Sequence, residues 1–309
     1  MKYLIITLFS VVSILGANLC AQIDITDSHG KYTFDSPPKR FVVLNWALAE
    51  QLLELGESPV GIAGLTEFET LSTRYSLPEG TVNVGSRLNP NLSTIRDLKP
   101  EVIFIGYSQR SLIRPLSNIA TVIYFKNFGK RYNNAAKSEE RFLELAKLFQ
   151  KTGLAQEVLE FRNQALEKLK ATLVDKQTAD VVTNVLLIAP SGQGNTRFGV
   201  FGKNSLPYHA GLMIGLNVLS PEETDNFGVA QLSKKGLLEQ AASLSNEDVC
   251  LVVFEKYGVG NTTEMIDDLD KRHDCVLSID YQQAFGGVNS LLWLAQEYAQ
   301  SLIDNSSTP

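Results

Sequence analysis

Arg87 and Tyr107 are two side chains whose type and position would allow them to bind a ligand. Arg87 lies in a loop after a strand pattern, and Tyr107 stands just beyond the apolar run from Val102 to Ile105. Open α/β sheets bind ligands beyond the carboxyl ends of their strands. A guanidinium is always charged and offers forked donors, so it suits negatively charged oxygens. Taken alone, a single arginine is usually a surface charge, and a tyrosine after a strand can simply serve packing.

Three aromatic residues could supply the walls of such a site. Trp46 ends the first apolar strand run, Phe227 lies next to Gly228, and Phe285 lies next to Gly286. Aromatic surfaces commonly line pockets for ligands with apolar parts. Phe227 and Phe285 could equally belong to a hydrophobic core.

Enzyme signatures are absent from the sequence. It contains no G-x-S-x-G, P-loop or H-E-x-x-H motif, and the stretch Gly192–Gly194 lacks the last glycine of a dinucleotide fingerprint. The histidines His29, His209 and His273 do not cluster with Cys, Asp or Glu at metal-ligand spacing. These absences make catalysis less probable without excluding it.

The composition is that of a globular protein. The 309 residues are 44% hydrophobic and 20% charged, and the net charge is −6. That length suits two domains of ordinary size or one large one. The basic residues are scattered, so we predict no nucleic-acid partner.

The N-terminus is typical of a secretory signal peptide. A positive start is followed by a short apolar run, which predicts export, cleavage after residue 21 and a soluble product. Lipid attachment at Cys20 is the less favoured alternative, because Leu19 precedes it in place of a small residue. Export would permit a disulfide between Cys250 and Cys275, but two buried free cysteines are an equal alternative.

From residue 39 onward, short apolar runs alternate with amphipathic segments, as in parallel sheets covered by helices. A long helical pattern interrupts this alternation, and Thr152-Gly153 could divide it into two helices. We therefore predict an α/β fold of two Rossmann-like lobes with mainly parallel sheets, residues 22–137 and 174–309, joined by a helical connection over residues 138–173. The expected strands are Arg40–Asn45, Val60–Ala63, Glu101–Gly106, Thr121–Tyr124, Asn184–Ala189, Val249–Phe254 and Val276–Ile279. The expected helices are Ala47–Leu55, Asn91–Leu98, Leu112–Ile119, Ser205–Ile214, Gly236–Ala242, Met265–Lys271 and Ser290–Leu302.

Four stretches of the chain resemble metal-chelate binding proteins with two such lobes and a helical spine. Within that class the sequence is most similar to the periplasmic ferric-hydroxamate-binding proteins, over nearly all of the mature chain. The stretches are Arg40–Gly61 (RFVVLNW onward), Asn83–Ile103 (NVGSRLNPNL…LKPEVI), Phe201–Leu206 (FGKNSL) and Asn226–Ser233 (NFG…LS).

The resemblance implies roles for the residues named above. Arg87 and Tyr107 match positions that bind the iron-coordinating oxygens of a siderophore, while Trp46, Phe227 and Phe285 match or stand near pocket aromatics. It also implies an inner-membrane ABC permease as partner. The acids that usually pair with the permease would fall at Ser93 and near Lys235, where this chain has no acid; Asp97 and Glu239 lie nearby.

The resemblance thus implies capture, without chemistry, of an iron(III)–siderophore complex for an ABC importer. The expected protein is a monomer with no cofactor or metal of its own. A catecholate siderophore usually needs several basic residues, and Arg87 is the one clear candidate, so hydroxamate or mixed citrate–hydroxamate chelates are favoured. A binder of a catecholate, haem or corrinoid and an exported enzyme acting on the chelate remain alternatives.

Overall fold

The computed structural model describes residues 22–72, 74–126, 128–131, 133–176, 184–191, 197–243, 249–255, 275–280 and 285–306. Several sequence predictions lie outside these ranges. They are the signal peptide with Cys20, the polar stretch Gly192–Gly194, the helix Met265–Lys271 and His273. Within the described ranges, none of the helices is both long and apolar enough to span a bilayer.

The N-terminal lobe is built on a five-stranded sheet in the order β5-β4-β3-β6-β7, and every pairing in it is parallel. Buried apolar residues cover both faces, as the predicted strand–helix alternation requires. The strands are β3 (Phe41–Val43), β4 (Gly61–Ile62), β5 (Val82–Asn83), β6 (Val102–Ile105) and β7 (Thr121–Tyr124). The helices are α1 (Trp46–Glu54), α2 (Leu65–Leu71), α3 (Leu92–Asp97), the 3-10 helix η1 (Tyr107–Leu112) and α4 (Ile113–Ser117).

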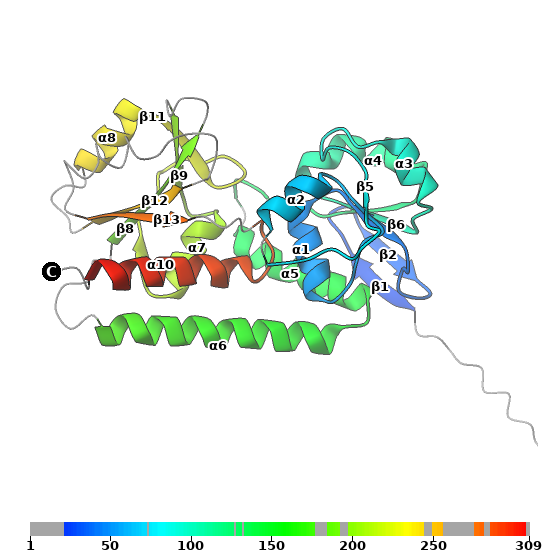
Figure 1. The fold of residues 1–309 in the computed structure, drawn as a ribbon, viewed down its shortest axis with the longest axis horizontal. Coiled ribbons are helices and arrows are strands. Elements are labelled where there is room, and N and C mark those ends of the chain that lie inside the picture. The colour runs from blue at the N-terminus through cyan, green and yellow to red at the C-terminus, as the bar shows by residue number, and fades with distance from the viewer. Residues whose placement is uncertain are drawn as a thin grey trace, which may run out of the picture.

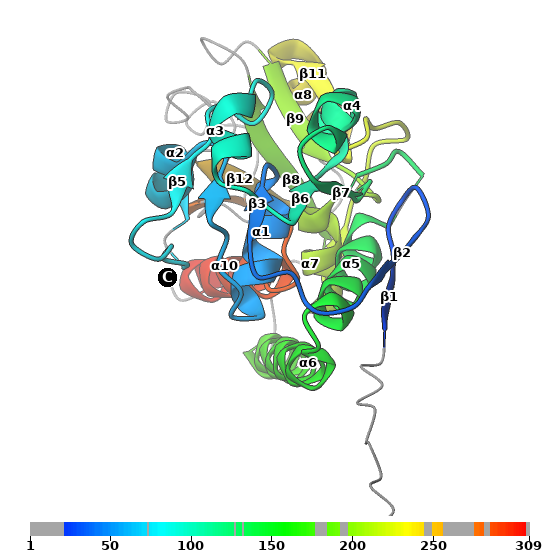
Figure 2. The ribbon, with the colours of Figure 1, turned by 90° about the vertical axis from the view of Figure 1, so that its right-hand side faces the viewer.

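A two-stranded antiparallel hairpin precedes this sheet and was not predicted. It consists of β1 (Ile23–Thr26) and β2 (Lys31–Phe34) and packs beside α5 (Asn134–Leu148), as Figure 2 shows. Ile23 and Ile25 join the core beneath it.

The predicted helical connection consists of two helices, the alternative that the sequence left open, and the break falls just before Thr152-Gly153. Helix α5 ends at Leu148, and α6 (Thr152–Lys176) begins after Gln150, whose φ of 54° breaks the helical path. Phe142 and Leu145 of α5 belong to the core of the first lobe. Helix α6 runs beneath both lobes, and its 25 residues span roughly 37 Å (Figure 1).

The C-terminal lobe carries a mixed sheet in the order β11-β9-β8-β12-β13. Its centre is parallel, but β9 pairs antiparallel with both β8 and β11. The strands are β8 (Asn184–Ser191), β9 (Arg197–Phe201), β10 (Asn217–Val218), β11 (Val229–Ser233), β12 (Val249–Glu255) and β13 (Val276–Asp280). The described helices are α7 (Leu206–Met213), α8 (Lys234–Ser243) and α10 (Ser290–Ser306), and α10 packs against both α6 and α7.

The cysteine pair that the sequence left open forms a disulfide. Cys250 lies on β12, and Cys275 directly precedes its parallel neighbour β13, with their Cα atoms 4.7 Å apart. The disulfide joins two cysteines that are 25 residues apart in the sequence, and it closes the chain between them into a loop. It therefore fixes β13, which leads toward the segment between the lobes.

Replacing both cysteines, Cys250→Ala with Cys275→Ala, should destabilise the protein by about 2–4 kcal/mol, because the unfolded chain regains the freedom of the closed loop. Urea unfolding measures this change. Reductant should lower the stability of the wild type by a similar amount and leave the double variant unaffected. Equal stability of the two proteins under oxidising conditions would contradict a structural role for the bond.

Candidate functional site

Three of the five predicted site residues lie at one edge of the N-terminal sheet. Trp46 follows β3, Arg87 follows β5 and Tyr107 follows β6. Because every strand of this sheet runs in the same direction, their carboxyl ends meet at one edge. This edge faces the second lobe.

Trp46 is fixed in place as a wall of the site. It is the first residue of α1, which Asn45 caps through a hydrogen bond from the Leu48 N–H. The indole Nε1 donates to the carbonyl oxygen of Ala63 at 2.8 Å, and only 5% of the side chain is exposed. Its ring meets that of Phe68 edge-on, with the centroids 5.9 Å apart.

Arg87 stacks on Trp46. Its guanidinium carbon lies 3.8 Å from the indole centroid, which is a cation–π geometry. Partial burial lowers the pKa of Arg87, and the charge of Glu67 opposes that shift. The N–H donors of a guanidinium lie in its plane, so a group whose face is stacked keeps donors at its edge.

The loop that carries Arg87 turns at Gly85. This glycine has a φ of 89° and forms an isolated bridge with Pro90. A Cβ atom on it would lie 3.1 Å from the backbone nitrogen of Asn91, so both conformation and space favour glycine here. The resulting tight turn places Arg87 beyond β5.

Tyr107 links the two lobes. Its hydroxyl accepts a hydrogen bond of 3.1 Å from Nδ2 of Asn226 in the C-terminal lobe. The backbone of Lys130 donates to Oδ1 of Asn226 at 3.1 Å, and Asn134 Nδ2 donates to its carbonyl oxygen at 3.3 Å. The loop that carries Asn226 is therefore fastened to the first lobe around Tyr107.

The two predicted phenylalanines of the second lobe take different positions. Phe285 reaches the first lobe, where its ring centroid lies 4.8 Å from that of Trp46. Phe227, next to Asn226, is 44% exposed and packs against Phe128 at 5.0 Å. The structure thus brings Trp46, Arg87 and Phe285 into one cluster and places Phe227 beside the link to Tyr107.

A buried carboxylate that sequence analysis missed holds Phe285 in this position. Glu50 of α1 is 1% exposed and accepts hydrogen bonds from the backbone of Gly287 at 2.8 Å, the backbone of Phe285 at 3.3 Å and the hydroxyl of Ser290 at 3.1 Å. Burial raises the pKa of Glu50 to about 7, although these hydrogen bonds oppose the shift. An acid on the apolar face of a predicted helix was the signal that could have identified it.

Neighbouring side chains extend this contact between the lobes. Ser138 donates its hydroxyl to the carbonyl oxygen of Gly286 at 2.7 Å, and Nη2 of Arg141 donates to the same oxygen at 3.4 Å. Glu54 accepts from Nδ2 of Asn289 at 2.6 Å, and burial raises the pKa of this carboxyl too.

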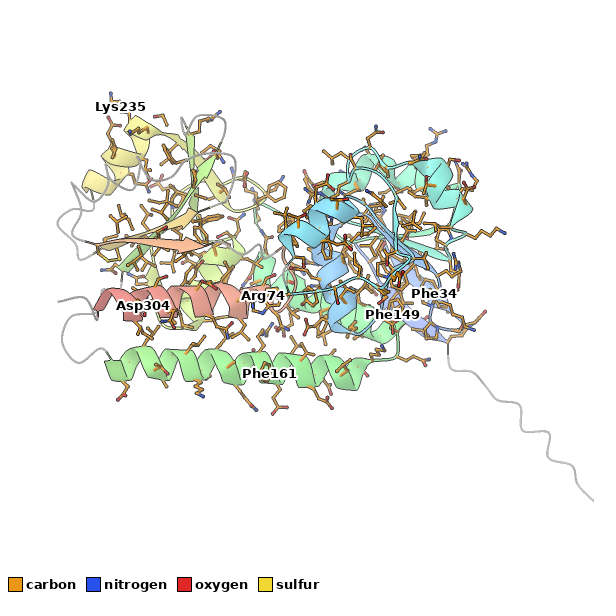
Figure 3. All side chains as sticks on the ribbon, in the orientation of Figure 1. Phe34, Arg74, Phe149, Phe161, Lys235 and Asp304 are labelled. Atoms are coloured by element: carbon orange, nitrogen blue, oxygen red, sulfur yellow. A yellow bond between two sulfur atoms is a disulfide. The ribbon has the colours of Figure 1, made fainter. Side chains whose placement is uncertain are left out.

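At the same junction, Arg74 of the first lobe stacks on Trp293 of α10, with 4.6 Å from guanidinium carbon to ring centroid. Figure 3 labels Arg74, which lies beside α10. The start of α10 is thereby fastened to the first lobe by an aromatic contact as well as by hydrogen bonds.

A cavity of about 870 Å³ adjoins the site on the side of the first lobe. Of the five predicted residues, Tyr107 is the one that lines it. The lining comes from the β1–β2 turn, η1, the end of β7, α5 and the start of α6: Thr26, Asp27, Ser28, His29, Tyr107, Arg110, Tyr124, Phe125, Lys126, Lys137, Glu140, Arg141, Leu143, Glu144, Lys147, Thr152 and Gln156.

The positions expected to meet a permease are exposed. Ser93 lies in the first turn of α3, where its N–H donates to Oδ1 of Asn91, and Lys235 lies on α8, 3.5 Å from the carboxylate of Glu239. Within the part of the chain that the structure describes, no group of three or more His, Cys, Asp and Glu side chains could hold a metal ion.

Comparison with known proteins identifies a family and several relatives that this chain resembles. The profile of the periplasmic binding protein family matches residues 41–199. The Fe(3+)-citrate-binding protein YfmC of Bacillus subtilis is 30% identical over 162 residues, which are 52% of this chain and 50% of that protein. The iron(3+)-hydroxamate-binding protein FhuD of Escherichia coli is 28% identical over 169 residues, 55% of each chain. The chain thus spans about half the length of these curated relatives.

Solved structures match over a greater length. The siderophore-binding protein FhuD of Vibrio cholerae, solved with Fe3+–Desferal, superposes with a TM-score of 0.74 and 28% identity, over 85% of this chain and 97% of that one. The petrobactin-binding protein YclQ of Bacillus subtilis superposes with a TM-score of 0.71 at 19% identity, over 91% and 98% of the two chains, and so supports the fold alone.

The wild-type free energy of unfolding should contain a pH-dependent contribution from Glu50. The unfolded carboxyl ionises near its ordinary pKa of 4.5, but the folded one ionises at about 7. The folded state therefore retains a proton that the unfolded chain loses. The contribution of Glu50 to the free energy of unfolding is fully present below pH 4.5. About 3 kcal/mol of it is lost as the pH rises through 7.

Glu50→Gln should remove this contribution, so its stability relative to wild type should increase between pH 5 and pH 8 in urea unfolding. The exposed Glu79→Gln is a matched control for loss of one acid and should show a constant difference. A constant difference for Glu50→Gln over the same range would contradict the raised pKa.

Proposed function

The chain belongs to the periplasmic binding protein family, and we propose that it captures an iron(III)–siderophore complex in the periplasm and delivers it to an ABC importer in the inner membrane. The proposed cargo is a chelate with hydroxamate or mixed citrate and hydroxamate groups. Two similar proteins named above bind iron(III) citrate and iron(III) hydroxamate, which supports this class of ligand.

The observation that carries the proposal is the stacking of Arg87 on Trp46, whose ring also contacts Phe285 of the other lobe. The cluster joins a cation to aromatic surfaces at the edge where parallel sheets bind ligands. A ferric hydroxamate presents negatively charged, metal-bound oxygens around the iron and apolar linkers outside them. One charged donor with aromatic walls is complementary to that pattern.

In this proposal the siderophore supplies every iron ligand, and the protein recognises the complex from outside. The edge of the Arg87 guanidinium donates to the iron-bound oxygens, and the Tyr107 hydroxyl provides a second polar contact. Phe285 and Phe227 pack against the linkers, and the buried Trp46 supports Arg87 and Phe285 from beneath. No bond is made or broken, so the complex can be released intact.

The contacts between the lobes favour a largely preformed site. Glu50 and Tyr107 join the lobes through hydrogen bonds, and α6 spans both of them. A site that is already ordered loses less conformational entropy on binding. Delivery would then depend on the permease recognising the exposed faces around α3 and α8. There Ser93 and Lys235 replace the usual acids, so Asp97 and Glu239 are the candidates for contact.

Titration with ferric hydroxamates should quench the fluorescence of Trp46, because iron chelates bound against an indole accept its excitation energy. Trp293→Phe removes the other tryptophan and makes the signal specific. In that background, Arg87→Ala should weaken binding by about tenfold to a hundredfold, the value of one or two charge-assisted hydrogen bonds. Arg87→Lys should recover only part of the loss, since lysine lacks the planar fork.

A panel of chelates tests the cargo. Binding of a catecholate, haem or corrinoid without any hydroxamate would leave the binding role in place and overturn the cargo. Conversion of the chelate during incubation would support an enzyme instead. Absence of binding by calorimetry to every member of the panel would overturn the siderophore proposal.

A further inference from the structure

Glu67 is an exposed carboxylate beside the proposed chelate site. It lies in the first turn of α2, on the side of the first lobe that is nearest to the second lobe (Figure 1). The next residue, Phe68, is buried, and its ring meets that of Trp46 edge-on. The start of α2 therefore borders the aromatic cluster of the site, with an acid on its exposed side.

A turn without a side chain allows Glu67 to approach the indole of Trp46. Gly64, the residue before α2, has a φ of 64°. A Cβ atom on this glycine would lie 3.0 Å from Cζ2 of Trp46 and 3.5 Å from Oε2 of Glu67. The carboxylate and the edge of the indole thus border the same small space, which a larger residue at position 64 would fill.

The same turn is joined to the loop that carries Arg87. The N–H of Gly64 donates to the carbonyl oxygen of Gly85 at 2.7 Å, and Gly85 forms the tight turn before Arg87. The guanidinium of Arg87 covers the face of the indole, 3.8 Å from its centroid, while Glu67 lies near the edge of the same ring. Two opposite charges therefore flank Trp46.

The two charged groups influence each other through space. Partial burial lowers the pKa of Arg87, and the charge of Glu67 opposes that shift. Within the described ranges no salt bridge joins these two residues. Glu67 can therefore accept a hydrogen bond from a ligand while Arg87 donates to another part of it.

We propose that Glu67 sets the charge preference of the site, so that the protein favours iron(III) hydroxamates that carry a protonated amine on an outer arm. Neutral and carboxylate-bearing hydroxamates would bind less tightly. The inference rests on the proposed function and narrows its cargo. In this arrangement Arg87 donates to the iron-bound oxygens, and the carboxylate of Glu67 accepts a hydrogen bond from the ammonium group of the arm.

The chemistry of the chelates explains the expected preference. Three hydroxamate anions neutralise iron(III), so the net charge of such a chelate resides on its outer arms. An ammonium group beside a carboxylate forms a charge-assisted hydrogen bond, whereas a second carboxylate is repelled. Because Glu67 is exposed, water and salt screen the interaction, and the preference should be modest.

Three forms of one linear tris-hydroxamate with a terminal amine test this inference. Acetylation of the amine removes its charge, and succinylation replaces the charge with that of a carboxylate. In calorimetry with the iron(III) complexes, the wild type should bind the free amine about twofold to fivefold more tightly than the acetylated form. The succinylated form should bind more weakly still, and added salt should reduce both differences.

Variants of Glu67 separate charge preference from other roles of this residue. Glu67→Gln should bind the free amine and the acetylated form equally, and its affinity for the acetylated form should stay within about twofold of wild type. Glu67→Lys should reverse the order of the three chelates. Glu69→Gln is the matched control and should keep the wild-type order, because Glu69 is an exposed acid of the same helix but residues two apart do not share a helix face.

Equal wild-type affinity for the three chelates would overturn the charge preference and leave the proposed function in place. An equal loss for all three in Glu67→Gln would also overturn it, because Glu67 would then act only by positioning Arg87. Failure of the wild type to bind any of the three would instead overturn the proposed function.

Discussion

The buried carboxylate of Glu50 is the contact on which the geometry of the site depends. It accepts hydrogen bonds from the backbones of Phe285 and Gly287, just before α10, and thereby holds Phe285 against Trp46. Trp46 in turn carries Arg87 on its face. A substitution at Glu50 would therefore shift Phe285 and Trp46 and, through these two rings, the Arg87 guanidinium of the proposed site, although Glu50 itself is buried.

Burying a carboxylate is costly, and this cost is partly offset by the hydrogen bonds that it accepts. An apolar residue at position 50 could pack without that cost, but it could not satisfy the backbone N–H of Gly287. The polar contact also specifies one relative placement of the lobes, because hydrogen bonds are directional and apolar packing is not. Together with α6, it accounts for a preformed boundary at which a rigid chelate can bind.

Much of this architecture could be predicted from the sequence. The apolar runs that become β3, β6 and β12 were recognised because central parallel strands are buried on both faces. The β1–β2 hairpin was missed, since short strands with exposed alternate residues resemble loops. The antiparallel β9 is buried along its last four residues, but it was missed because its five-residue run RFGVF is short and contains a glycine. The cavity could not be predicted, because its lining joins the β1–β2 turn to α5, more than a hundred residues away, through a contact such as that of Glu144 with Thr26. Arg87 and Tyr107 follow strands and match ligand-binding positions of the family that the sequence resembles, and this resemblance made them candidates. The stacking of Arg87 on Trp46 depends on loop geometry that spacing does not encode.

A crystal structure of the protein with a ferric siderophore, in which anomalous scattering locates the iron, tests the central claim most directly. The account predicts an iron peak at the boundary between the lobes, beside the Arg87 guanidinium and the Tyr107 hydroxyl, with the siderophore against Trp46 and Phe285. Every iron ligand should come from the siderophore. An iron peak in the far end of the cavity near Lys147, on the outer surface of either lobe, or coordinated by protein side chains would contradict it.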